Sequence, residues 1–189
     1  VTVSKNNDSI SVSANGAHVT VTSSVVGTEI TYLLSGSSSD GSLTINGDYK
    51  LTLALNGLAL TNSTGAAIDV ECGKRIAVTL ADGSTNTLID GTGGSQKACF
   101  YVKGHAEFSG AGSLALTGNT KHAFSSKEYL EIKKSAGSIV VDSAVGDGVH
   151  CGQYFEMNGG TVTVANTKGD CIDADDLGNV KIKGGTLNL

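Results

Sequence analysis

Five aspartates near the C-terminus could together hold a divalent cation. Asp147 stands between two glycines, Asp170 follows a glycine, and Asp173, Asp175 and Asp176 come shortly after it. If these segments stack on adjacent strands, their side chains lie about 4.8 Å apart, where like charges repel unless a cation lies between them. Calcium takes carboxylate oxygens at about 2.3–2.6 Å and can bridge two such groups. The sequence therefore predicts a calcium site built from Asp147, Asp170, Asp173 and Asp175, with a solvated acidic turn as the alternative.

Aromatic rings and carboxylates recur together at a second place. Three rings each stand two residues before a glutamate, in the pairs His105 and Glu107, Tyr129 and Glu131, and Tyr154 and Glu156. On a flat strand face, rings can contact the apolar faces of sugars while carboxylates accept hydroxyl hydrogen bonds. These six residues are the predicted carbohydrate-binding surface. The alternative is plain strand-to-strand packing, in which Lys133 or Lys127 neutralises Glu131.

His150 is a third candidate, because the register of the repeats places it between Ser125 and Asp173. A histidine beside an aspartate can act as a catalytic base, but a lone surface histidine is more often a hydrogen-bonding member of a strand ladder. The sequence has no Gly-x-Ser-x-Gly motif and no glycine-rich phosphate loop. We therefore expect a protein that is not an enzyme.

Three short segments must position these residues, and each returns about every 23 to 25 residues in the C-terminal half. The first segment begins at residues 100, 124, 149 and 172, the second at 106, 130, 155 and 180, and the third at 114, 139, 162 and 187. Each segment alternates apolar and polar residues, which is the period of a β-strand. Glycines precede the third segment each time, and glycine suits tight corners because it reaches positive φ.

The repeat predicts an all-β fold, namely a right-handed single-stranded parallel β-helix with three short strands and about 24 residues per coil. The absence of proline from the 189 residues fits, because proline would remove a ladder hydrogen bond from any inner coil. An antiparallel sandwich is the alternative, but it predicts hairpin turns rather than in-phase triplets. We expect one domain of about eight coils, with residues 1–40 as N-terminal strands or a cap and residues 41–189 as the coils.

Composition restricts the partners. The formal net charge of −5 disfavours a nucleic-acid backbone and permits cation binding. No run approaches 18 apolar residues, so no membrane span is expected. The four cysteines have no CxxC spacing and form no His/Cys cluster of the zinc type. Cys99 and Cys171 share a column three coils apart, which at about 14 Å is too far for a disulfide.

Four runs of the chain resemble a known family. They are LNGLALTNSTGAAI at residues 55–68, VTLADGSTNTL at 78–88, GDGV at 146–149 and GGTVTV at 159–164. Together they resemble bacterial extracellular carbohydrate-binding domain-containing proteins that have a polysaccharide-lyase-like parallel β-helix. The resemblance covers about residues 25–189. It implies calcium in the turns and acidic plant-type polysaccharides as ligands.

Carried over residue by residue, the resemblance assigns the calcium ligands. Asp147 and Asp170 match the repeated Gly-Asp-Gly turn, and Asp173 and Asp175 match the Asp-Ala-Asp that follows it. The preceding coil departs from this pattern, because residues 121–122 are Lys-His where the motif has Gly-Asp. Fewer ions are therefore expected than relatives hold.

We expect a non-catalytic, secreted or cell-surface bacterial module that binds polysaccharide rich in uronic acid, with calcium as a possible requirement. A cell-surface adhesin or structural module is the alternative. A polysaccharide lyase is less favoured, because its chemistry needs a base such as arginine or lysine near the metal. The single arginine, Arg75, is distant from the aspartates in the repeat, and only Lys103 and Lys127 fall beside the Asp175 column.

Overall fold

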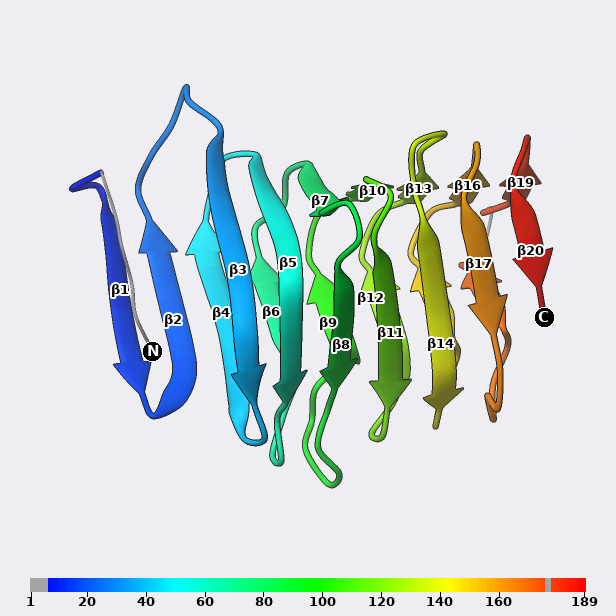
Figure 1. Ribbon diagram of the computed structural model, residues 1–189, viewed down its shortest axis with the longest axis horizontal. Helices are drawn as coiled ribbons and strands as arrows, with labels where there is room; N and C mark the ends of the chain where they lie inside the picture. The colour runs from blue at the N-terminus through cyan, green and yellow to red at the C-terminus, as the bar shows by residue number, and fades with distance from the viewer. Residues whose placement is uncertain (1–6, 176–177) are drawn as a thin grey trace.

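The computed structural model describes residues 7–175 and 178–189, in which every regular element is a β-strand. The parallel strands wind into a β-solenoid of about seven turns with about 25 residues per turn (Figure 1). The predicted all-β solenoid is confirmed. The length of a turn agrees with the expected 24 residues or so. About seven turns are present where about eight coils were expected, because the first strand pairs antiparallel with the second and adds no turn of its own.

The first face of the solenoid is an eight-stranded sheet. Its strands, in spatial order, are β1 (Ile10–Asn15), β2 (Ala17–Ser23), β4 (Gly41–Gly47), β6 (Ile68–Glu71), β9 (Ala98–Val102), β12 (His122–Ser126), β15 (Val149–Cys151) and β18 (Ile172–Ala174). All neighbours after the β1–β2 hairpin pair in parallel. The first repeated segment of the sequence therefore forms this face.

The other two faces belong to one twelve-stranded sheet that is joined through β5 (Leu51–Thr61). The second face continues from β5 through β7 (Ile76–Leu80), β10 (Ala106–Ser109), β13 (Leu130–Ile132), β16 (Phe155–Met157) and β19 (Val180–Ile182). The third face continues through β8 (Thr85–Ile89), β11 (Ser113–Gly118), β14 (Ser138–Ala144), β17 (Thr161–Val164) and β20 (Thr186–Asn188), while β3 (Ile30–Ser38) pairs with β5.

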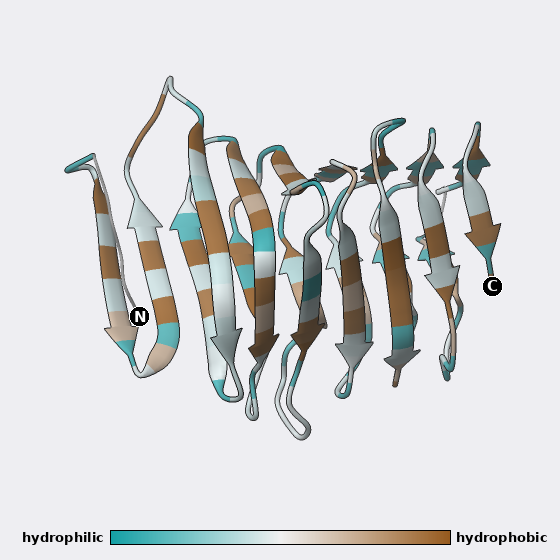
Figure 2. Ribbon diagram, viewed as in Figure 1, coloured by the Kyte–Doolittle hydropathy of each residue, from teal (hydrophilic) through white to brown (hydrophobic). Residues whose placement is uncertain are grey.

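Alternation along each strand builds the core. Inward residues are buried and aliphatic or aromatic, while their neighbours point outward, as the brown and pale bands of Figure 2 show. Phe100, Phe108 and Phe124 meet edge to face near the middle, with ring centroids 5.4–6.1 Å apart. Such contacts add to the free energy of burial, so these rings hold two faces of adjacent coils together.

Two elements of the N-terminal half differ from the sequence pattern. Asn56 and Gly57 interrupt the apolar alternation between residues 51–55 and 58–60, yet both stretches form the single strand β5, which belongs to both faces of the large sheet. Strand β8 was missed, because Asn86 occupies an inward ladder position next to Leu114. Its buried amide accepts a hydrogen bond from the Leu58 backbone N–H and donates one to the Ser113 carbonyl. This polar side chain therefore has hydrogen-bond partners inside the core.

Further expectations concern the termini, cysteines and membrane. Within residues 1–40, β1 and β2 form a hairpin and β3 already lies in the solenoid beside β5. All four cysteines are free thiols. In the described part of the chain there is no helix of the length and apolar character that a bilayer span requires.

The corners give a stability prediction that compares Gly110→Ala with Gly83→Ala. Both glycines have positive φ, 84° and 70°, but only a Cβ at Gly110 would collide with the carbonyl oxygen of Leu80. We expect Gly83→Ala to cost about 1 kcal/mol through the left-handed backbone alone. Gly110→Ala should cost about 2–4 kcal/mol, because overpacking is added. Urea unfolding of both variants measures this, and equal losses would contradict the close contact.

Candidate functional site

The predicted aromatic and carboxylate columns are present on the second face. Glu107, Glu131 and Glu156 are register partners on β10, β13 and β16, and Lys181 follows on β19. Their side chains point outward because the residues on either side of each are buried. Residues far apart in the sequence thus form one continuous row across four coils.

The rings of the adjoining column stack on one another. The ring centroids of His105 and Tyr129 are 4.2 Å apart at 15°, and those of Tyr129 and Tyr154 are 4.7 Å apart at 3°. Both faces of Tyr129 are therefore covered, and the column presents ring edges outward. Burial raises the pKa of Tyr129 and of Tyr154, with smaller contributions from the neighbouring glutamates and, for Tyr129, from the phenol of Tyr154. The two phenols consequently keep their protons at neutral pH and can donate hydrogen bonds.

Basic side chains neutralise the glutamate column. The Lys133 ammonium lies 2.6 Å from the Glu131 carboxylate and 3.4 Å from that of Glu107, and Lys183 lies 2.8 Å from Glu156. Burial by itself would lower the pKa of Lys133, but the hydrogen bond to Glu131 and the charge of Glu107 outweigh it and raise that pKa. The column is therefore a chain of alternating charges. Lys133 thus neutralises Glu131, as the alternative interpretation of the sequence expected, and the predicted column is present as well.

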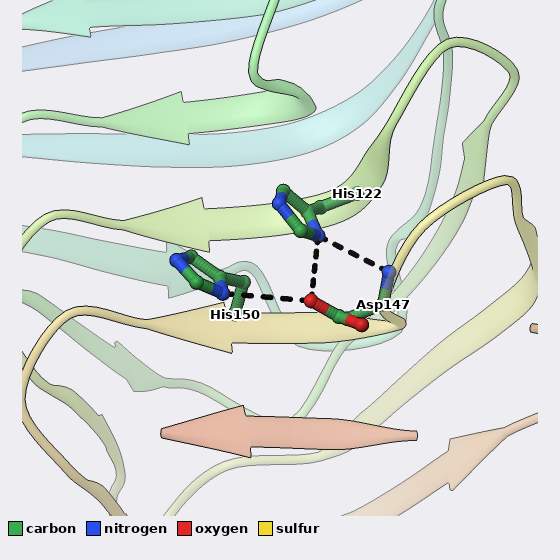
Figure 3. A group of neighbouring side chains, drawn as sticks. All are labelled: His122, Asp147 and His150. Carbon is green, nitrogen blue, oxygen red and sulfur yellow. Dashed lines mark hydrogen bonds and ion pairs between the residues drawn. The ribbon is translucent and has the colours of Figure 1, made fainter. Parts of the chain in front are cut away.

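The aspartates of the predicted calcium site lie on the first face and in the turns beside it. One oxygen of Asp147 accepts the backbone N–H of Asp170 at 2.9 Å. Its other oxygen, Oδ2, lies 3.0 Å from Nδ1 of His122 and 3.5 Å from Nδ1 of His150 (Figure 3). Asp173 Oδ2 lies 2.9 Å from the same nitrogen of His150. The structure thus joins Asp147 and Asp173 to imidazoles.

The remaining aspartates are more open. Asp175 Oδ2 lies 3.6 Å from Nε2 of His150, and half of its side chain is exposed. Asp170 contributes its backbone N–H to Asp147. Asp176 lies outside the described residues.

His122 is the member of this group that sequence reasoning missed. Its side chain is only 6% exposed, and its ring stacks on that of His150 with centroids 4.4 Å apart. Burial, and secondarily the neighbouring His150, lower the pKa of His122 to about 4, so the ring is neutral at pH 7. The signal was the register, because His122 stands two residues before Phe124 as Asp147 stands two before Val149. It was seen only as a departure from an aspartate motif.

The donor atoms bear on the expected calcium ion. Two groups of three described residues could hold a metal, namely His122 with Asp147 and His150, and His150 with Asp173 and Asp175. Both include imidazole nitrogen, whereas calcium takes oxygen ligands. The residues therefore fit calcium poorly, and calcium at Asp147, Asp170, Asp173 and Asp175 stays a prediction.

The charge chain of the second face predicts the effect of Lys133→Met. Removing this ammonium leaves Glu107 and Glu131 without their shared partner, so unfolding should need about 1 kcal/mol less free energy at neutral pH. A raised lysine pKa means that the stabilisation is present below the ordinary value of 10.5 and is lost as pH rises through the folded pKa. Parent and variant should therefore converge in strong alkali. Lys134→Met, at the exposed neighbouring residue, is the matched control and should change little; a loss equal to that of Lys133→Met would contradict the assignment.

Comparisons with known proteins agree with this architecture. The chain is 26% identical over 120 residues to a carbohydrate-binding domain-containing protein of Acetivibrio thermocellus, a match that covers 58% of this chain and 41% of the relative. It therefore spans about two-fifths of the length of that protein.

A solved structure shares the fold. A polysaccharide lyase-like protein from C. thermocellum, studied as a gadolinium derivative, superposes with a TM-score of 0.77 at 24% identity, over 97% of this chain and 75% of that one. The sequence model of one family matches residues 15–189, which is most of the chain. The chain belongs to the family of carbohydrate-binding domain-containing proteins.

Proposed function

We propose that this chain is a non-catalytic module that binds polysaccharide and that the second face is its binding surface. The family description supports carbohydrate as the ligand class. The observation that carries the choice of surface is the ring column of His105, Tyr129 and Tyr154, which runs beside the outward glutamates of the same coils. A long polymer can contact such a repeated row at several coils at once, so weak contacts add up.

The stacked rings determine how a sugar would be held. Tyr129 has a ring on each side, so no sugar can lie flat on its faces. Its edge and phenol, like those of Tyr154, remain available for hydroxyl hydrogen bonds. The proposed binding mode is therefore polar contact along ring edges and glutamates, in place of the flat stacking that the sequence suggested.

Uronic-acid-rich polysaccharide is the finer part of the proposal. Lys133, Lys181 and Lys183 lie along the same row, and the Lys181 ammonium is 5.6 Å from the ring centre of Tyr154. Ammonium groups on a surface can pair with the carboxylates of an acidic polymer. A secreted or cell-surface location belongs to the same proposal, because it would bring the module to such polymers.

Two of the three bases considered for lyase chemistry, Arg75 and Lys103, are paired with carboxylates. Arg75 lies 2.5 Å from Glu29 and 3.8 Å from Glu107, and Lys103 lies 3.1 Å from Glu71. The hydrogen bond and charge of Glu71 raise the pKa of Lys103, so this side chain stays protonated at neutral pH and is not available as a base. These contacts support a binding role without catalysis.

Substitution of the outer tyrosine tests the surface. Tyr154→Ala removes one ring edge and one phenol from the row, and we expect binding to polygalacturonate to weaken about tenfold, which corresponds to about 1.4 kcal/mol. Affinity electrophoresis or calorimetry measures the loss. Tyr49→Ala, on a tyrosine outside the row, should bind as the parent does.

Other outcomes of that experiment discriminate among functions. Equal binding by Tyr154→Ala and the parent would rule out the second face as the binding surface. No binding to any acidic or neutral glycan would favour the adhesin alternative. Preference for a neutral β-glucan would rule out only the proposal that the ligand is rich in uronic acid. An unsaturated sugar product, detected by its ultraviolet absorbance, would show a lyase.

Chelation tests the calcium prediction separately. Because the imidazoles give mixed nitrogen and oxygen donors, we expect polysaccharide binding to change less than twofold when calcium is removed with a calcium-selective chelator. The same titration with and without added calcium measures this. A loss of tenfold or more, restored by calcium, would establish a calcium requirement.

A further inference from the structure

Two imidazole nitrogens and one carboxylate oxygen lie close together beside β12 and β15. Asp147 Oδ2 lies 3.0 Å from His122 Nδ1 and 3.5 Å from His150 Nδ1, as Figure 3 shows. All three atoms lie within 4.8 Å of one another. In a tetrahedral zinc site with bonds of about 2.0 Å, ligand atoms are separated by about 3.3 Å. The two measured separations bracket that length.

We propose that Nδ1 of His122, Nδ1 of His150 and Oδ2 of Asp147 bind a divalent transition-metal ion of the zinc class. Two imidazoles and one carboxylate are a donor set that zinc accepts with a further position for water or another ligand. The same set is unsuited to calcium or magnesium, which take oxygen. The site therefore differs in chemistry from the calcium site that the aspartates suggested.

The hydrogen bonding at His122 favours a cation. The backbone N–H of Asp147 donates to Nδ1 of His122 at 3.1 Å, so this nitrogen presents its lone pair. The carboxylate oxygen 3.0 Å away also presents lone pairs, and two acceptors at that distance repel. An ion bound by both atoms would relieve this repulsion. Because Nδ1 has a single lone pair, the Asp147 N–H gives up its hydrogen bond to Nδ1 when the ion binds.

Burial holds the His122 ring in place. Its Nε2 is buried and has no hydrogen-bond partner among the described residues, so Nδ1 is the nitrogen of this ring that faces the other two donor atoms.

Asp175 provides the support that metal-bound histidines usually have. When Nδ1 binds an ion, a neutral histidine carries its proton on Nε2, and that N–H commonly points to a carboxylate. Asp175 Oδ2 lies 3.6 Å from Nε2 of His150 and can close this distance because its side chain is half exposed. Asp173 Oδ2 now lies 2.9 Å from Nδ1 of His150, and the ion would replace Asp173 at this nitrogen.

Binding also requires one ring to turn. The two imidazole planes are 13° apart and stacked, so an ion in the plane of one ring lies off the plane of the other. His122 is held by burial, whereas the side chain of His150 is 21% exposed. His150 should therefore turn toward the ion, and its proton resonances should lose the shielding that stacking on His122 gives.

Titration of the whole chain with zinc after chelator treatment tests the proposal. We expect one ion per chain by calorimetry, and a cobalt complex without the charge-transfer band of a cobalt–thiolate bond. Asp175→Asn should weaken binding about tenfold, within the range for an outer partner. His150→Ala and Asp147→Asn should each weaken it more than about 100-fold, because they remove a ligand itself.

His18→Ala is the matched control. His18 lies 3.7 Å from Asp40 on the same face, but among the described residues it belongs to neither group of potential metal ligands. It should bind zinc as the parent does, and circular dichroism confirms that each variant is folded. Absence of zinc binding, equal affinity in His150→Ala and the parent, a thiolate band with cobalt, or displacement of zinc by an equal concentration of calcium would each overturn the proposal.

Discussion

The hydrogen-bonded stacking of one coil on the next is the constraint on which the rest of the structure depends. Parallel strands lie about 4.8 Å apart, so a residue type that recurs in register must lie directly against its own kind. This constraint holds Phe100 beside Phe124 in the core. On the surface it sets the 4.2–4.7 Å spacing of the ring column, in which aromatic side chains meet face to face. In this column the stacked rings therefore present their edges outward.

The same spacing makes a column of charges costly, and the two faces solve the problem differently. On the second face, Lys133 lies between the carboxylates of Glu107 and Glu131. On the first face, imidazoles take the place of ammonium groups, and His150 is approached by Asp147 from its own coil and by Asp173 from the next. Lysine carries a fixed charge, whereas a neutral imidazole offers a lone pair. One face is thereby neutral and hydrogen-bonding, and the other holds the donors that a soft cation prefers.

The repeat explains why so much of the fold could be predicted from the sequence. Register alone located the glutamate column, the ring column and the place of His150 beside Asp173. It failed where a side chain departs from the pattern. Asn86 hid strand β8, because a buried amide that satisfies its own hydrogen bonds looks like a surface residue. Nor could the register show ring orientation, since side-chain torsions decide whether a tyrosine lies flat or on edge.

His122 shows how a departure from a motif can be informative in itself. In the column that continues to Asp147, a third aspartate would have added another negative charge at the coil spacing, and that arrangement calls for a hard cation with oxygen ligands. An imidazole at this position removes the charge, contributes nitrogen and, through its burial, stays neutral. The substitution thus changes both the electrostatics and the metal preference of the column at once. A chain can keep its solenoid and the row proposed to face sugars while a single residue in another column alters which ion that column suits.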